Sequence, residues 1–231
     1  MRPCVVVNVA MSADGKISTR ERRQIKISGA LDFKRVDRLK AGSDAVMVGI
    51  GTVLADDPSL TVKSEEYHTT RRHLGLDEHP ARIVVDSNAR IPLDASVLHK
   101  GDGKRIVAVS GRADPGKIAI LQKNATVVTA GVNKVDLEIL MEKLGEMGIQ
   151  RVMVEGGGTL IAGLIKAGLV DEIYTFIGNI IIGGKDSPTF VDGDGYILES
   201  AFTQLALLET QMIENGVLLH WAVSNPNENK K

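Results

Sequence analysis

The sequence predicts an α/β fold in which helices flank a mostly parallel sheet and an antiparallel hairpin adds strands at one edge. Short apolar segments typical of buried strands alternate with segments whose apolar residues recur at helical spacing, as far as residue 177. Further on, Asn215-Gly216 separates two extended apolar runs, which indicates a β-hairpin. No linker rich in Pro, Gly or Ser interrupts the pattern, so we expect one domain over residues 1–224 and a disordered polar tail over 225–231.

Composition narrows the class of protein. With 231 residues, 43% of them hydrophobic, the chain can bury a substantial core. The balance of 28 basic and 29 acidic residues leaves no strong field to attract nucleic acid or an anionic membrane, and no segment approaches the roughly 20 apolar residues of a membrane span. A single cysteine, Cys4, excludes an internal disulfide and a multi-cysteine zinc site, so we expect a cytoplasmic protein.

Each element has a local signal. Ser28 is a candidate N-cap for a helix that ends at Gly42, with Leu31, Val36 and Leu39 on its buried face. Further helices are predicted at 50–57, 114–122, 136–148 and 159–167, and strands at 4–9, 45–48, 81–86, 105–110, 126–129, 151–154, 173–177, 202–210 and 216–223. The polar segment 63–80 has no periodicity and is predicted to be a surface loop, with Arg71 and Arg72 solvated.

The most informative stretch is the strand–turn–helix around Glu155-Gly156-Gly157-Gly158-Thr159. Glycines allow a main chain to approach a ligand closely, and the first turn of a helix offers unpaired N–H groups to an anion. The spacing matches neither the dinucleotide fingerprint nor a Walker loop. Two interpretations remain open, a phosphate-binding turn and a connection that serves packing alone.

Other loops are expected to meet this turn. Ligands of open α/β sheets bind beyond the carboxyl ends of parallel strands, where we place loops 8–14, 49–57, 86–88 and 155–159. Two of these loops begin helices with glycines and contain Thr52 and Thr159, which suits a ligand with more than one phosphate. No nucleophile elbow, metalloprotease motif or zinc-deaminase motif occurs, which favours chemistry supplied by a cofactor.

Four motifs in the same order resemble the reductase family of riboflavin biosynthesis. They are residues 8–16 (NVAMSADGK), 51–62 (GTVLADDPSLTV), 82–87 (RIVVDS) and 155–159 (EGGGT). The resemblance implies a dihydrofolate-reductase-like fold, NADPH as cofactor with NADH left open, and reduction of the ribosylamino group of 2,5-diamino-6-ribosylamino-4(3H)-pyrimidinone 5′-phosphate to ribitylamino. Since the first reductase strand starts the chain and no zinc motif precedes it, the chain resembles the stand-alone archaeal or fungal type.

The resemblance also assigns residues. Those that match cofactor contacts are Ala10, Thr52, Asp56, Ser87, Gly156, Gly157, Gly158, Thr159 and Leu160. Those expected on the substrate side are Asn8, Lys40, Leu60, Lys63 and Glu155, with Gln24 and Lys26 added from a variable stretch. Lys40 and Lys63 stand where bacterial members often have arginine, and a lysine provides a point charge instead of a bidentate fork.

The implied reaction is hydride transfer to C1′ of a Schiff base formed by the opened sugar, and the protein mainly positions the two partners. Glu155, Asp56 and Asp57 are the acids at hand; Glu155 is favoured as a substrate hydrogen-bond acceptor, and water remains an equal candidate for the proton donor. Structural roles are the alternatives for Asp56, Asn8 and Glu155. Another reductase of a pterin or pyrimidine, or a non-catalytic nucleotide-binding module, stays open as a function, and a homodimer is expected.

Overall fold

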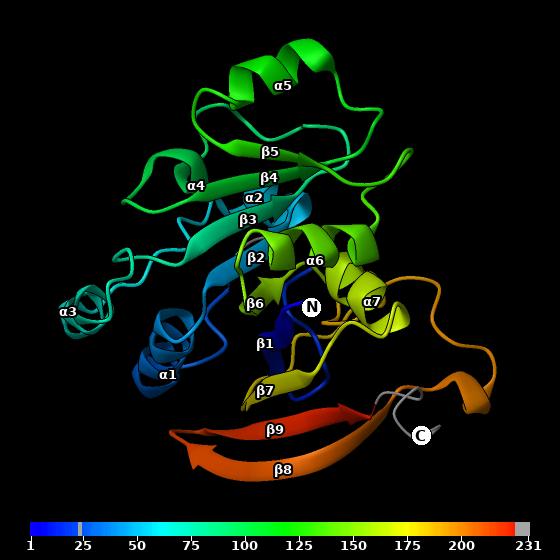
Figure 1. Cartoon of the computed structure of the whole chain (residues 1–231). Coiled ribbons are helices and arrows are strands. Elements are labelled where there is room, and N and C mark those ends of the chain that lie inside the picture. The colour runs from blue at the N-terminus through cyan, green and yellow to red at the C-terminus, as the bar shows by residue number, and fades with distance from the viewer. Residues whose placement is uncertain (23–24, 225–231) are drawn as a thin grey trace.

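The computed structural model describes residues 1–22 and 25–224, so Gln24 and the predicted tail 225–231 lie outside the described residues. The described residues form a nine-stranded sheet in the order β5-β4-β3-β2-β6-β1-β7-β9-β8 (Figure 1). The strands are β1 (Cys4–Ser12), β2 (Ala45–Gly49), β3 (Ala81–Val85), β4 (Arg105–Val109), β5 (Thr126–Thr129), β6 (Arg151–Gly156), β7 (Glu172–Gly178), β8 (Gln204–Ile213) and β9 (Gly216–Ser224).

The predicted α/β architecture is confirmed. Strands β1 to β7 pair in parallel, and β9 pairs antiparallel with both β7 and β8. The hairpin turns at Glu214-Asn215, between the paired residues Ile213 and Gly216, as the Asn-Gly signal predicted. Strand β1 extends to Ser12, three residues beyond the predicted end, and this extension pairs it with β7 along its length.

Helices cover both faces of the sheet (Figure 1). They are α1 (Ala30–Ala41), α2 (Ile50–Asp56), α3 (Glu65–His73), α4 (Ser96–His99), α5 (Pro115–Leu121), α6 (Leu137–Glu146) and α7 (Gly158–Lys166), with a 3₁₀ turn at Glu199–Ala201. One core joins α6 and α7 to the sheet, and a second core joins α2, α4 and α5 to its other face. No helix within the described residues is long and apolar enough to cross a membrane.

Two predictions about helix α1 are wrong. Its N-cap is Gly29 instead of Ser28, and Leu31 is exposed instead of buried. The buried positions of the helix are the charged residues Asp32, Arg35 and Asp37. The apolar pattern failed because Asp32 and Arg35 pair with each other, while polar partners on β1 and just before α3 compensate Arg35 and Asp37, so the polar stripe faces inward.

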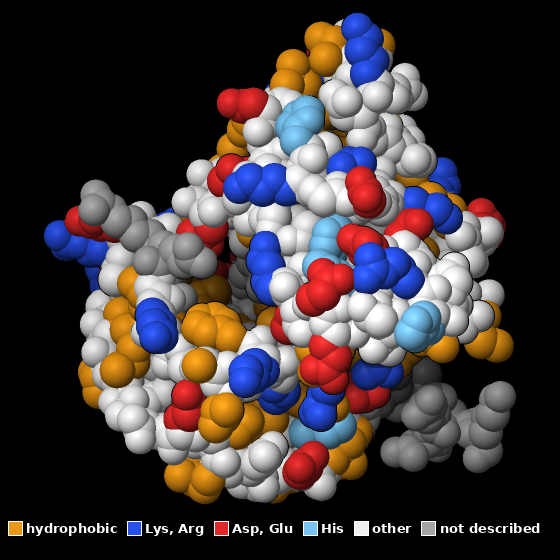
Figure 2. Space-filling model, turned by 90° about the vertical axis from the view of Figure 1, so that its left-hand side faces the viewer, with side chains coloured by type: hydrophobic (Ala, Val, Ile, Leu, Met, Phe, Trp, Pro, Cys, Tyr) orange, Lys and Arg blue, Asp and Glu red, His pale blue; other side chains and the backbone are white. Residues whose placement is uncertain are grey.

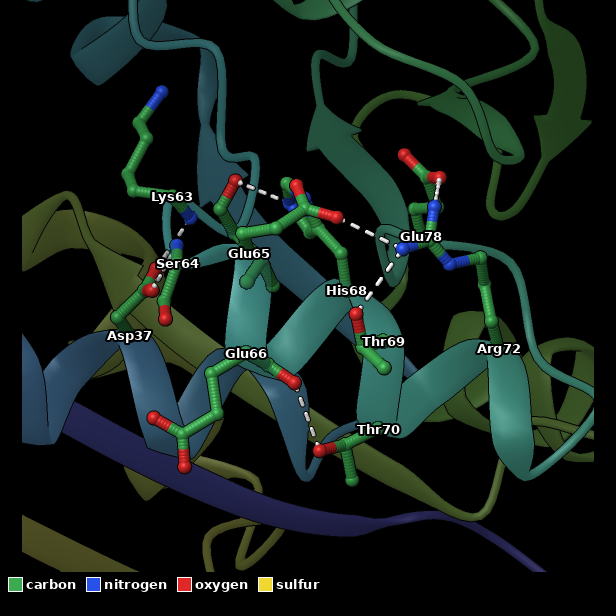
Figure 3. Close-up of polar contacts among 11 residues, drawn as sticks. Asp37, Lys63, Ser64, Glu65, Glu66, His68, Thr69, Thr70, Arg72 and Glu78 are labelled. Atoms are coloured by element: carbon green, nitrogen blue, oxygen red, sulfur yellow. Dashed lines mark hydrogen bonds and ion pairs between the residues drawn. The ribbon is translucent and has the colours of Figure 1, made fainter.

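Helix α3 lies where a surface loop was predicted. Asp37 of α1 accepts hydrogen bonds from the backbone N–H groups of Lys63 and Ser64, both at 2.8 Å, and so fixes the entry to α3 (Figure 3). Glu65 and Glu66 in the first turn and basic residues in the last turn complement the helix dipole. These polar contacts, instead of an apolar stripe, stabilise the helix, so its sequence lacked the periodicity used to detect it.

The two arginines of α3 differ from one another. Arg72 stays at the surface and bridges Glu65 and Glu78, on a face where acidic and basic side chains intermingle (Figures 2 and 3). Arg71 is buried, contrary to its predicted solvation, and donates to the carbonyl groups of Ala41, Ser43 and Asp77. It therefore ties α3 to the chain between α1 and β2.

His79 makes stability depend on pH in this region. Its ring is buried edge-on against His68, 4.9 Å between centroids, and its Nδ1 has no hydrogen-bond partner within the described residues. Burial, with smaller contributions from His68 and Arg82, lowers the pKa of His79 below its ordinary value. The folded state therefore keeps this ring neutral at pH values where the unfolded chain already binds a proton.

We expect the urea midpoint to fall as pH drops from about 7.5 to about 5.5, across the ordinary histidine pKa of about 6.5. The stabilising contribution of a neutral His79 is complete above that pKa and is lost below it. His79→Gln should reduce this pH dependence, whereas the exposed His73→Gln should keep it. An equal fall in His79→Gln and the native chain would assign the effect to other groups.

Candidate functional site

A large cavity, about 1450 Å³ in volume, lies at the carboxyl ends of the parallel strands. The four loops expected to converge there do line it. Twelve of the residues proposed from the sequence contribute to its wall: Asn8, Ala10, Thr52, Asp56, Leu60, Ser87, Glu155, Gly156, Gly157, Gly158, Thr159 and Leu160. Lys40, Lys63 and Asp57 do not line it, and Gln24 lies outside the described residues. Lys26, from the variable stretch, also lines it.

The glycine turn before α7 has a backbone that side chains disfavour. Gly156 and Gly157 have φ values of +139° and +64°. A Cβ on Gly157 would lie 3.5 Å from Oγ1 of Thr52 and 4.0 Å from Cα of Gly49. The two glycine-containing bends, one before α2 and one before α7, are therefore neighbours across the cavity wall.

Glu155 projects from an irregularity in the sheet. Along β2 and β6, Met47 pairs with Val154, but the next residue, Val48, pairs with Gly156. Glu155 is thus the extra residue of a β-bulge, a feature that redirects a side chain away from the regular alternation. Its carboxylate lines the cavity and forms an ion pair with Nζ of Lys40 at 3.0 Å.

The two adjacent aspartates at the end of α2 have separate environments. Asp56 lines the cavity, and its buried Oδ1 has no hydrogen-bond partner within the described residues. Burial raises the pKa of Asp56. Asp57 instead accepts hydrogen bonds from the backbone N–H and hydroxyl groups of Ser96, which lower its pKa. Asp57 therefore anchors α4, and Asp56 is the acid presented to the cavity.

The loop after β3 connects the cavity to α6. Asp86 is fully buried and accepts a hydrogen bond from the N–H of Ile91 at 2.8 Å, which closes the predicted strand-end turn. Ser87 Oγ accepts one from the N–H of Val135 at 2.9 Å. The segment before α6 is thereby brought to the cavity, where Asn133, Lys134 and Asp136 join its wall.

Leu60 occupies a strained position in the loop after α2. It is buried, lines the cavity and has a φ of +56°, which is uncommon for a residue with a branched side chain. Such conformations persist only where the surrounding structure enforces them, and they concentrate at functional sites. Its position thus agrees with a role in shaping the pocket.

The two lysines lie behind the wall. Lys63 Nζ donates to Oγ of Ser59 and Oγ1 of Thr61, at 2.9 and 2.8 Å. Its pKa is lowered, first by burial and then by the positive charge of Lys40. Lys40, Lys63 and Lys100 bring positive charge to this end of the site, against the carboxylates of Asp37 and Glu155.

The sequence missed a buried polar cluster on α1. Asp32, only 1% exposed, lines the cavity and accepts a hydrogen bond from Nε of Arg35 at 2.7 Å. Arg35 in turn donates to Oδ1 of Asn8, also at 2.7 Å. The spacing of Asp32 and Arg35 was a usable signal, because positions three apart share one face of a helix.

A second group of missed residues comes from the chain after β7. Pro188 and Asp192 line the cavity beside α7, and the N–H of Asp192 donates to the carbonyl group of Gly158 at 3.2 Å. Thr189 fixes the Asp192 carboxylate through its N–H and hydroxyl groups. No periodicity or motif marked this segment, so only the fold reveals it.

The fold and this cavity define an α/β protein with a large cavity across the carboxyl edge of its parallel strands, the place where such sheets hold their ligands. The chain belongs to the RibD C-terminal domain family, whose model matches residues 3–219. A protein of Archaeoglobus fulgidus is 52% identical over 85% of this chain and 90% of its own length, and one of Methanothermobacter thermautotrophicus is 42% identical over 96% and 99%. Both are named 2,5-diamino-6-ribosylamino-4(3H)-pyrimidinone 5′-phosphate reductase.

Solved structures support the same fold. RibD of Acinetobacter baumannii superposes with a TM-score of 0.78 at 24% identity, over 96% of this chain and 58% of that one. Dihydrofolate reductase of Enterococcus faecalis superposes with a TM-score of 0.51 at 11% identity, over 95% and 96%. The predicted dihydrofolate-reductase-like fold is confirmed, and a reductase of this family and fold uses a nicotinamide cofactor.

Proposed function

We propose that this chain reduces the ribosylamino group of 2,5-diamino-6-ribosylamino-4(3H)-pyrimidinone 5′-phosphate to ribitylamino, with NADPH as reductant. The chain is an oxidoreductase by its family and by two relatives that match it over most of their length. The observation that carries the proposal is one cavity with a glycine-lined end and a polar end. Such an enzyme works in the cytoplasm, where reduced nicotinamide is supplied.

The glycine-lined end fits the cofactor. The first turn of α7 presents unpaired N–H groups, and a Cβ on Gly156 or Gly157 would lie within 4 Å of Oγ1 of Thr52 in the same wall. Thr52 and Ser87 add hydroxyl groups, and the unpartnered Oδ1 of Asp56 is an acceptor for a ribose hydroxyl. A reduced nicotinamide bound there would supply a hydride to C1′ of the Schiff base of the opened sugar, whose nitrogen would take up a proton from water or a nearby acid.

The polar end fits the pyrimidine. A 2-amino-4(3H)-pyrimidinone presents two neighbouring donors, the 2-amino group and N3–H, and a carboxylate accepts both in a bidentate pair. Asp32 is the buried carboxylate on this wall, and Arg35 keeps its charge compensated. Glu155 on its bulge supplies a further acceptor, and Lys40 and Lys63 supply positive charge for the substrate phosphate.

The direct test is turnover by the purified chain. Loss of reduced-nicotinamide absorbance is followed with NADPH or NADH and the diaminopyrimidinone phosphate, alongside its deaminated 2-oxo analogue. We expect turnover with NADPH and preference for the 2-amino compound. Cofactor binding without turnover of either compound would instead support a non-catalytic module, and turnover of only another pterin or pyrimidine would support a different reductase.

We also propose a homodimer formed through β8. Nine of the ten residues of this edge strand are exposed, among them Leu205, Leu207, Leu208 and Met212. A long apolar edge strand with unpaired backbone groups promotes aggregation unless another chain covers it. A second copy of β8, related by a two-fold axis, can pair with it as an antiparallel strand.

Leu208→Glu, a change from 56% exposed leucine to a charge on this edge, is therefore expected to yield monomers in sedimentation velocity runs. Leu74→Glu, at a 70% exposed leucine at the end of α3, serves as the matched control and should sediment like the native chain. A native chain that sediments as a monomer at micromolar concentration would refute the dimer.

A further inference from the structure

A row of side chains crosses three strands beneath the polar end of the cavity. Asn8 of β1 pairs with Tyr174 of β7, and Tyr174 pairs with His220 of β9. Directly paired residues of neighbouring strands project from the same face of a sheet. Asn8, Tyr174 and His220 therefore lie side by side on the face that carries Arg35 of α1, since Arg35 donates to Asn8.

Tyr174 lies between two cationic or ionisable groups. The His220 ring stacks on it with 3.9 Å between centroids and 10° between planes, and Cζ of Arg35 lies 5.7 Å from the Tyr174 centroid. Because the imidazole covers one face of the phenol ring, the guanidinium takes the other. His220 is itself held by Glu172, with 2.9 Å between Nε2 and Oε2.

The two hydrogen bonds of Arg35 do not fully fix the orientation of its guanidinium group. Its side chain is 8% exposed, its Nε binds Asp32, one terminal nitrogen binds Asn8, and the other has no hydrogen-bond partner within the described residues. A cation above an aromatic face is attracted by the ring quadrupole, most strongly when water is excluded. The Tyr174 ring thus supplies the remaining restraint on the guanidinium plane.

We propose that Tyr174, backed by His220, is a positioning residue that holds Arg35 and, through it, sets the Asp32 carboxylate and the Asn8 amide for the pyrimidine ring. This inference rests on the proposed function, because it takes Asp32 and Asn8 to contact substrate. Neither Tyr174 nor His220 lines the cavity, so their effect on substrate passes through Arg35. The glycine turn follows β6, outside this row of strands, so the effect is confined to the substrate end.

The test compares Tyr174→Leu with Tyr174→Phe. Loss of the ring in Tyr174→Leu is expected to raise the KM for the diaminopyrimidinone phosphate about three- to tenfold, the range of a partly desolvated cation–π contact, and to leave the KM for NADPH unchanged. Tyr174→Phe keeps the ring and should restore the native KM. Trp221→Leu is the matched control, because Trp221 lies on β9 on the opposite face, packed against the main core.

Each outcome either supports or overturns the positioning role of Tyr174. A selective rise in substrate KM that phenylalanine restores and Trp221→Leu lacks supports the positioning role. Equal changes in both KM values, or the same selective rise in Trp221→Leu, would show a general structural effect and overturn it, as would a native KM in Tyr174→Leu. Absence of turnover in the native chain would refute the proposed function itself. Failure of the proposed function is thus distinguishable from failure of the positioning role alone.

Discussion

Replacing Gly157 with valine is expected to raise the KM for NADPH at least about tenfold, with a smaller effect on the KM for the pyrimidine. A Cβ at this position would already lie 3.5 Å from Oγ1 of Thr52 and 4.0 Å from Cα of Gly49, so the two methyl groups of valine are expected to fill the space between the two glycine-containing bends. They would occupy the approach to the N–H groups proposed to bind the cofactor phosphates. Losing about 1.4 kcal/mol of binding free energy corresponds to that tenfold change.

Backbone strain must be separated from lost binding. At a φ of +64° a β-branched residue is disfavoured, so the variant will also lose about 1–3 kcal/mol of stability. Gly148 has a φ of +84°, a Cβ added to it would meet no atom within 4 Å, and it lies outside the cavity. Gly148→Val therefore reproduces the strain alone. Urea midpoints of Gly157→Val and Gly148→Val show whether the two variants lose similar stability, as the comparison requires.

If Gly157→Val has the KM for NADPH of the native chain, the turn before α7 does not bind the cofactor phosphates, and the packing interpretation of these glycines is correct. If Gly148→Val raises that KM equally, strain and not occlusion explains the change. The assignment of this turn to the cofactor is supported only if the rise in the KM for NADPH occurs in Gly157→Val and not in Gly148→Val.

Most of the sheet was predictable because its signals are local. The run from Cys4 to Val9 is apolar apart from Asn8, since parallel strands are buried on both faces, and the hairpin is marked by Asn215-Gly216. Two predicted helices begin at Asp114 and Asp136, and both carboxylates accept backbone hydrogen bonds in the first turn of α5 and α6. Signals of this kind require no knowledge of distant residues.

The missed features depend on tertiary contacts. Buried Asp32, Arg35 and Arg71 each contradict the rule that charged residues are solvated. Asp32 and Arg35 pair with each other on one helix, and the further partners are Asn8, distant in sequence, for Arg35 and backbone carbonyl groups for Arg71. The bulge that redirects Glu155 arises from the register between β2 and β6, which no single segment encodes. Such local contradictions concentrate at functional sites, and Asp32 and Glu155 both line the cavity.

Asp32→Asn offers a test of substrate recognition with a change of specificity as its readout. The native carboxylate accepts from both donors of the 2-amino compound, and charge-assisted hydrogen bonds contribute about 1.5–3 kcal/mol each, so kcat/KM for that compound should fall about a hundredfold. The amide presents one donor and one acceptor, the pattern that matches the carbonyl and N3–H of the 2-oxo analogue. The preference between the two compounds should therefore shift towards the analogue, while the KM for NADPH stays unchanged.

Asp44→Asn provides the matched control for this variant. Asp44 is a structural carboxylate that accepts hydrogen bonds from the backbone N–H groups of Gln150 and Arg151 at the amino ends of β2 and β6, away from the cavity. It should lose stability without altering the preference between the two pyrimidines. Asp32→Asn could instead lose activity equally towards both compounds. The carboxylate would then support Arg35 and Asn8 without contacting the 2-amino edge, because a purely structural role cannot distinguish substrates that differ only at that edge.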